Sequence, residues 1–238
     1  MHSMITIFNV LCLVAFLDSL VLLRTSRGLI RSDRQPWYAW WAMCFICLAL
    51  LSASFFSRLT SFSTVLMMLS CPMLYSSGDI LWTRVGYSPS RSLKFSLVLL
   101  AFLVLLPIAV SVLLWKGLSW HIPTLGDVKI PWLDVAITGA VAAVGEEILF
   151  RHYLQGRLGL LAQRFVSKDI ARVCVMIGST AILFAVVHIG LIEPLWVKWL
   201  QMLILGLCLG IIRLWWGLWY AMGAHLIFNG SVALLLML

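Results

Sequence analysis

The sequence has few charged residues. Of its 238 residues only 11% are charged, nine are acidic and three of those nine are glutamates, against 63% that are hydrophobic. Soluble globular domains carry about 25% charged residues, so this composition excludes that class. The chain also lacks a long polar segment, because the longest connections between its apolar runs are residues 116–131 and 151–172. We therefore expect an integral membrane protein whose function lies within the membrane.

The apolar runs are each long enough, at ~20 residues, to cross ~30 Å of hydrocarbon. The runs are Met4–Leu23, Trp37–Phe56, Phe62–Trp82, Phe95–Trp115, Trp132–Phe150, Val173–Leu191, Trp196–Ile212 and Leu218–Leu238. They predict an all-α, polytopic membrane helix bundle of about eight transmembrane helices. No internal repeat or flexible linker divides the chain, so we expect a single integral membrane domain over residues 1–238.

The distribution of the basic residues predicts how the chain is oriented in the membrane. The chain has 17 of them and a net charge of +8, which invites a nucleic-acid interpretation. However, they divide 13 to 4 between alternate loops, and an excess of Lys and Arg marks the cytoplasmic side of a membrane protein. This predicts that both termini lie outside, in the inner or plasma membrane if the protein is bacterial. The expected surroundings are the lipid bilayer, with no nucleic acid.

The cysteines do not indicate a functional site. All six lie within predicted spans, where a small apolar residue is a sufficient explanation, and they predict no disulfide framework. Cys44 and Cys47 form a CxxC pair, but no second pair or nearby histidine completes a metal site there.

Two of the three glutamates, Glu146 and Glu147, are adjacent within the apolar stretch 136–150. Carboxylates inside a membrane are costly and are functional-site candidates by default. Arg151 follows Glu147 by four residues, on the same helix face and in the favourable order, so we expect these two to pair. Glu146 is offset by about 100° around the helix, which leaves it free for chemistry.

Two histidines lie in later spans. Phe184 precedes His188 by four residues, and His225 precedes Asn229 by four residues, so each pair shares one helix face. Three helices would then each bring polar groups to a shared cavity.

The chemistry of these groups suits hydrolysis. A carboxylate base, two imidazoles and an amide can activate water and stabilise the oxyanion formed when an amide bond is attacked. Alternatively, Glu146, His188 and His225 would hold a zinc ion that activates the water, so the cofactor is either none or zinc. Taken singly, each group has a structural explanation, since a membrane-helix histidine is commonly an interhelical hydrogen-bond partner.

Taken in order, the motifs are specific. They are Glu146-Glu147-x3-Arg151, Phe184-x3-His188 and His225-x3-Asn229. The ordered set resembles the CPBP family of intramembrane proteases, the CAAX-prenyl-protease and bacteriocin-processing (Abi) group, whose signatures are EExxxR, FxxxH and HxxxN. The resemblance covers residues 132–238, the expected catalytic core. The four spans within residues 1–131 carry no motif.

The resemblance implies a glutamate-dependent intramembrane endopeptidase acting on a membrane-associated peptide or protein, such as a CAAX-like substrate or a sorting or leader peptide. It implies that Glu146 is the general base, that His188 assists it, and that His225 and Asn229 form the oxyanion site. Glu147, Arg151 and Phe184 would support them. The chain departs from the family pattern at His152, because the residue that follows the motif arginine is commonly a glycine.

Two other classes remain open, namely a proton-coupled transporter and a non-catalytic membrane scaffold of the same fold. Against the transporter, the chain shows no repeated hydropathy between its halves and no paired broken helices. At 1.5 Å per residue, Glu146 would lie about 20 Å into its helix, toward the cytoplasmic end, whereas His188 would lie near the outer end of its span. The sequence therefore leaves open which side the site faces. Asp79 is interpreted as a near-interface residue, and Asp18 is unassigned.

Overall fold

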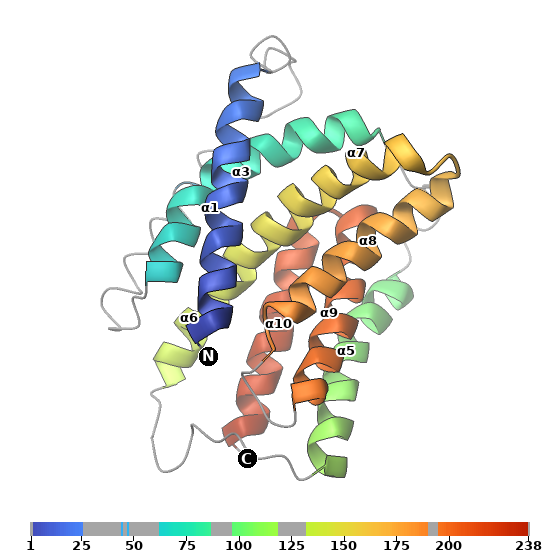
Figure 1. The fold of residues 1–238 in the computed structure, drawn as a ribbon. Helices are drawn as coiled ribbons and strands as arrows, with labels where there is room; N and C mark the ends of the chain where they lie inside the picture. Colours follow the sequence, from blue (N-terminus) through green and yellow to red (C-terminus); the bar gives the residue numbers. More distant parts are fainter. Residues whose placement is uncertain are drawn as a thin grey trace.

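Every element that the structure describes is helical. The computed structural model describes residues 2–25, 44, 47, 62–86, 97–118, 132–189 and 195–237, and no strand occurs among them. The elements are α1 (His2–Thr25), α3 (Phe62–Val85), α5 (Leu97–Leu118), α6 (Trp132–Glu146), η1 (Glu147–Leu154), α7 (Gln155–Phe165), α8 (Asp169–Val186), α9 (Leu195–Trp215) and α10 (Leu218–Met237) (Figure 1). The predicted all-α class is confirmed.

The chain is an integral, multi-pass membrane protein. Six of the described helices, namely α1, α3, α5, α8, α9 and α10, contain stretches long and apolar enough to cross a membrane. The predicted count of eight is not confirmed. The expected span Trp37–Phe56 lies outside the described residues apart from Cys44 and Cys47, and the expected span Trp132–Phe150 takes a different form.

That expected span is part of a longer helix. The 15-residue α6 passes into the eight-residue π-helix η1 and then into the 11-residue α7. The residues at both junctions, Glu146 and Gln155, keep right-handed helical backbone angles, so the helix continues without a break to Phe165. The predicted end at Phe150 is therefore wrong, and Glu146 lies near the middle of the helix rather than near its end. A long π-helix is rare and needs support from its surroundings.

Helix α8 is also shifted from its expected position. It begins at Asp169 and ends at Val186, and a turn over residues 187–189 carries His188. Figure 1 shows α8 ending partway along the bundle, well short of the end at which α5 and α10 finish. The expected mismatch in depth between Glu146 and His188 came from these two misplaced boundaries.

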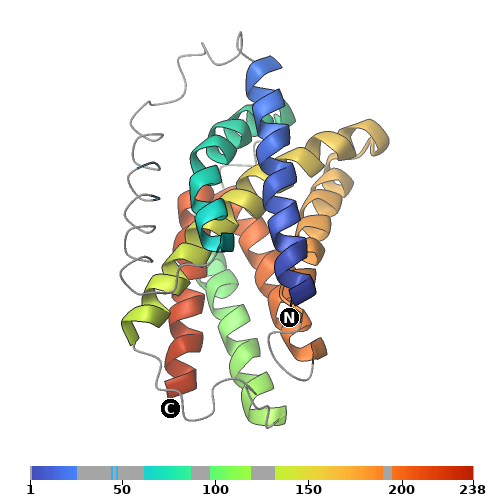
Figure 2. The same ribbon diagram turned by 60° about the vertical axis from the view of Figure 1, so that its left-hand side comes forward.

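The described helices run in both directions along the bundle. Figures 1 and 2 show that α1 begins and α10 ends at the same end of the bundle, whereas α1, α3 and α9 all finish at the opposite end. The last turns of those three helices hold Arg24, Arg84 and Arg213. These three arginines thus lie at the end opposite the start of α1 and the end of α10, whereas Lys198, near the start of α9, lies toward the other end.

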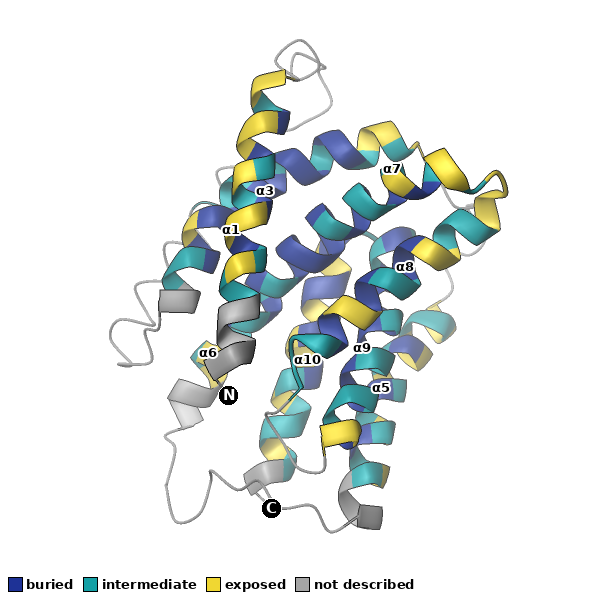
Figure 3. Ribbon diagram, in the orientation of Figure 1, coloured by how far each residue is buried: buried dark blue, intermediate teal, exposed yellow. Residues whose placement is uncertain are grey.

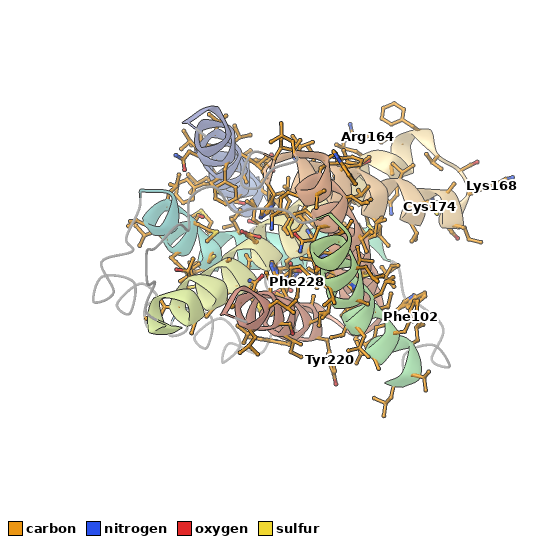
Figure 4. All side chains as sticks on the ribbon, turned by 90° about the horizontal axis from the view of Figure 1, so that it is seen from below. Phe102, Arg164, Lys168, Cys174, Tyr220 and Phe228 are labelled. Atoms are coloured by element: carbon orange, nitrogen blue, oxygen red, sulfur yellow. The ribbon has the colours of Figure 1, made fainter. Side chains whose placement is uncertain are left out.

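The outer faces are apolar. Helices α1 and α5 expose large hydrophobic side chains such as Leu17 and Val98, which suit contact with lipid (Figure 3). Seen along the bundle, Phe102 and Tyr220 lie at the periphery, whereas Phe228 lies inside (Figure 4). The interior surrounds η1, which contacts α1, α3, α8, α9 and α10.

Candidate active site

Three elements meet at Glu146, the last residue of α6. Its Oε2 atom lies 3.6 Å from Nε2 of His188 and 4.0 Å from Nε2 of His225. The side chain is 13% exposed, and Oε2 itself is buried without a hydrogen-bond partner among the described residues. Both separations are too long for a direct hydrogen bond and leave room for a bridging group.

The turn after α8 fixes the ring of His188. Nδ1 lies 2.7 Å from the backbone oxygen of Phe184. A carbonyl oxygen only accepts, so Nδ1 carries the hydrogen and donates it. In the neutral ring, Nε2 therefore presents a lone pair toward Glu146.

His225 on α10 contacts both glutamates. Its Nδ1 lies 2.9 Å from Oε1 of Glu147, while Nε2 faces Glu146. The ring is 3% exposed and packs edge-on against Phe184, with the ring centroids 5.9 Å apart. Glu147 thus orients the imidazole from the side remote from Glu146.

Glu147 also meets Arg151, as the spacing predicts. Nε of Arg151 lies 3.6 Å from Oε2 of Glu147, and both side chains are fully buried. The guanidinium stacks 4.3 Å over the ring of Phe184. Its three nitrogens have no hydrogen-bond partner within the described ranges. The ion pair with Glu147 and the contact with the ring of Phe184 are therefore the main interactions that stabilise its buried charge.

Phe184 serves as the packing centre of the cluster. The side chain is fully buried, and its ring meets Phe150 edge-on with the centroids 5.2 Å apart. Since it touches both His188 and Arg151, the FxxxH motif supplies a scaffold as well as a histidine.

Asn229 lies one turn beyond His225 and reaches a different partner. Its Nδ2 donates to the backbone oxygen of Gly139 on α6 at 3.1 Å. An added Cβ on Gly139 would lie 3.4 Å from Cβ of Asn229, so α6 and α10 approach closely here. The structure therefore brings Glu146, His188 and His225 together, whereas Asn229 contacts α6 at Gly139, about two turns before Glu146.

The metal-binding interpretation would place a zinc ion between Glu146 and the two histidines. Two imidazole nitrogens and a carboxylate oxygen are ordinary zinc donors, and zinc bonds of about 2.0–2.2 Å bring such donors close together. Within the described part of the chain, no group of three or more His, Cys, Asp or Glu side chains is close enough to hold a metal ion.

The charged groups of the cluster lie close together. Two buried carboxylates, Glu146 and Glu147, face the guanidinium of Arg151, and the ammonium of Lys198 also interacts with Glu146. Charges in a low-dielectric interior need such partners. Glu147 also bonds to Nδ1 of His225 and so holds the ring.

The sequence interpretation missed a second group of polar contacts, which link α1 and α3 to η1 and α7. Asp79 on α3 lies 3.2 Å from Nε2 of His152, and Asp18 on α1 accepts a hydrogen bond from the hydroxyl of Tyr153. Asp18 also pairs with Arg157 at 2.7 Å. The available signal was the presence of acidic residues inside apolar spans, which requires partners.

Comparison with known proteins gives one match. Residues 128–231 match the family model described as "Type II CAAX prenyl endopeptidase Rce1-like". The matched segment holds all three motifs and the whole of η1. No curated protein and no solved structure matches the chain significantly.

Proposed function

Because residues 128–231 of this chain match the model of the type II CAAX prenyl endopeptidases, a family of proteases, we propose that the protein hydrolyses a peptide bond of a membrane-associated peptide or protein with a water molecule that Glu146 activates. The observation that carries the proposal is the buried Oε2 of Glu146, which has no partner in the described residues and faces Nε2 of both His188 and His225.

Two of these atoms, Oε2 of Glu146 and Nε2 of His188, need a hydrogen donor between them. A carboxylate accepts only, and Nε2 of His188 accepts as well, because its Nδ1 is the donor to Phe184. A water molecule is the small donor that fits between these acceptors, which are 3.6 Å apart. Its hydrogens would point to Glu146 and His188, which leaves an oxygen lone pair for attack.

The reaction then follows from the geometry. Glu146 takes one proton as the water oxygen bonds to the substrate carbonyl carbon, and the carbonyl oxygen becomes an oxyanion. When the C–N bond breaks, the leaving nitrogen takes the proton back from Glu146. The products are one carboxyl-ended and one amino-ended peptide, with one water consumed. Such acid–base catalysis contributes about 10²–10⁴-fold.

His225 and Asn229 are assigned to the oxyanion. A proton on His225 gives Nε2 a hydrogen to donate, while Glu147 holds the opposite side of the ring. The amide of Asn229 has two hydrogens, of which Gly139 takes one, so the second is available to the substrate. Donors that meet a developing oxyanion supply a large part of catalysis.

The substrate class follows from the family. A bond in a peptide anchored at the membrane, such as a prenylated CAAX-type carboxyl terminus or a sorting or leader peptide, would be presented to a site within a lipid-facing bundle.

The test is accumulation of unprocessed membrane peptides in cells. Mass spectrometry would compare cells that carry the wild type, Glu146→Gln, His188→Ala or His225→Ala at matched protein levels. We expect the same precursor to accumulate in all three mutants. Unchanged processing in all three would contradict the proposal.

A further inference from the structure

The π-helix η1 is held by side chains from outside the matched segment. It follows Glu146 directly and carries Glu147 and Arg151, so its register sets where the acidic and basic groups of the site point. A π-helix has wider i→i+5 hydrogen bonding and is uncommon outside functional sites. Relaxation of η1 to an ordinary α-helix would rotate α6 and α7 relative to each other. Something must therefore stabilise it.

Helix α3 contacts η1 at His152. Nε2 of His152 lies 3.1 Å from the backbone oxygen of Tyr75 and 3.2 Å from Oδ1 of Asp79. In return, Nε1 of Trp82 donates to the backbone oxygen of His152 at 2.9 Å. Three residues of α3 thus bond to one residue of η1.

Arg213 fixes the proton on this histidine. Its NH2 atom lies 2.8 Å from Nδ1 of His152, and its guanidinium stacks 4.2 Å over Trp82. Arginine only donates, so Nδ1 accepts and the ring hydrogen is on Nε2, where Tyr75 and Asp79 take it. The ring is therefore held from α3 and α9 at once.

Gly78 makes room for the ring. A Cβ at position 78 would lie 2.4 Å from Cδ2 of His152. The small residue lies on α3 and the large one on η1. The two positions fit each other.

Helix α1 contacts the next residue of η1. Asp18 accepts a hydrogen bond from the hydroxyl of Tyr153 through Oδ2 and from NH2 of Arg157 through Oδ1, the latter at 2.7 Å. Consecutive residues point in different directions around a helix. Contacts at His152 and Tyr153 therefore hold η1 from two sides.

We propose that Asp79 and Asp18 are positioning residues, which act through His152 and Tyr153 to keep η1 in π-helical form and so aim Glu146 and Glu147 at the reacting atoms. This assigns a task to α1 and α3, which lie outside residues 128–231 and carry no motif. It also gives a reason for two acids within apolar spans. The inference rests on the proposed function.

The test measures kcat and KM for processing of the precursor that accumulates in Glu146→Gln cells. Purified Asp79→Leu and Asp79→Asn proteins would be compared, with each rate expressed per folded molecule and with Tm recorded in detergent. Asn keeps an acceptor for His152, whereas Leu does not. We expect Asp79→Leu to lower kcat by about 10- to 100-fold with KM within threefold, and Asp79→Asn to stay within threefold in kcat.

The second arm tests Asp18. Tyr153→Phe removes one hydroxyl and remains informative if a leucine variant does not fold. We expect Tyr153→Phe and Asp18→Leu each to lower kcat about tenfold, and the double variant to lose no more than the larger single loss, because both act through one contact. Asp169→Leu is the control, since Asp169 is an exposed ion-pair partner of Arg172 at the start of α8, and its kcat should not change.

The outcomes separate the two claims. If Glu146→Gln is inactive but folded Asp79→Leu and Tyr153→Phe keep wild-type kcat, the positioning role is overturned and the proposed function stands. Equal losses in Asp79→Leu and Asp79→Asn also overturn it. If Glu146→Gln is itself active, the proposed function fails first.

Discussion

His225 and Glu147 form a hydrogen bond, with Nδ1 of the imidazole 2.9 Å from Oε1 of the carboxylate. Glu147 is also the ion-pair partner of Arg151, so it joins the cation of the first motif to the histidine of the third. The two adjacent glutamates thus have different tasks. Glu146 faces the space between the histidines, whereas Glu147 supports the groups around that space.

The first prediction concerns the stability of this support. Glu147→Gln removes the charge that compensates buried Arg151, and breaking a buried pair costs about 3–5 kcal/mol. We therefore expect a large drop in the free energy of unfolding, together with loss of activity, measured by thermal or denaturant unfolding in detergent. Asp169→Asn removes an exposed ion-pair partner and should cost no more than about 1 kcal/mol. Equal effects of the two changes would contradict the assignment.

Asn229 provides the second prediction. Asn229→Ala removes the proposed oxyanion donor, and the loss of one such donor lowers kcat by about 10²–10³-fold. The measurement is turnover of the purified variant in lipid vesicles. Ser231→Ala is the control, because that hydroxyl is in an exposed position and bonds to its own helix at Ile227. If Asn229→Ala lowers stability but leaves kcat per folded molecule unchanged, Asn229 is only a link between α10 and Gly139.

The third prediction concerns the packing between α8 and α9. A Cβ on Gly206 would lie 3.0 Å from the backbone Cα of Ala181, so Gly206→Ala must push α8 away and cost about 1–3 kcal/mol. Because His188 follows α8 directly, we also expect lower activity. Gly178→Ala is the matched control on α8: no atom lies within 4 Å of its added Cβ, and alanine in a helix interior should stabilise by about 0.5–1 kcal/mol. Similar unfolding curves for the two variants would refute the close approach.

Much of this arrangement follows from the sequence. Few charges and long apolar runs predict a helical membrane protein, and four-residue spacing predicts the pair Glu147–Arg151. Both are observed, because these signals are local and depend on composition and helix periodicity.

The sequence did not predict the continuation of the helix through Arg151 or the end of α8 at Val186. The predicted span ended just before Arg151, but Arg151 is fully buried and paired within the bundle. The roles of Asp18, Asp79 and His152 were likewise hidden, because their partners are 61 or more positions away in the chain. Such pairings depend on tertiary packing, which periodicity does not report.

The fourth prediction concerns metal ions. In our account the protons move between water, Glu146 and the leaving nitrogen, so treatment with a chelator should leave turnover within about twofold of the untreated rate. The measurement compares purified protein before and after 1,10-phenanthroline, with metal content determined in parallel. Loss of activity that zinc restores would contradict the glutamate mechanism and favour a metal held by Glu146 and the two histidines.

The most direct test uses purified protein in lipid vesicles and the precursor that accumulates in Glu146→Gln cells. Products of the wild type and of Glu146→Gln would be measured by mass spectrometry. The account predicts that the wild type yields two fragments whose masses sum to the precursor plus one water, and that Glu146→Gln is at least about 100-fold slower although folded. Cleavage by Glu146→Gln at the wild-type rate, or no cleavage by the wild type, would contradict it.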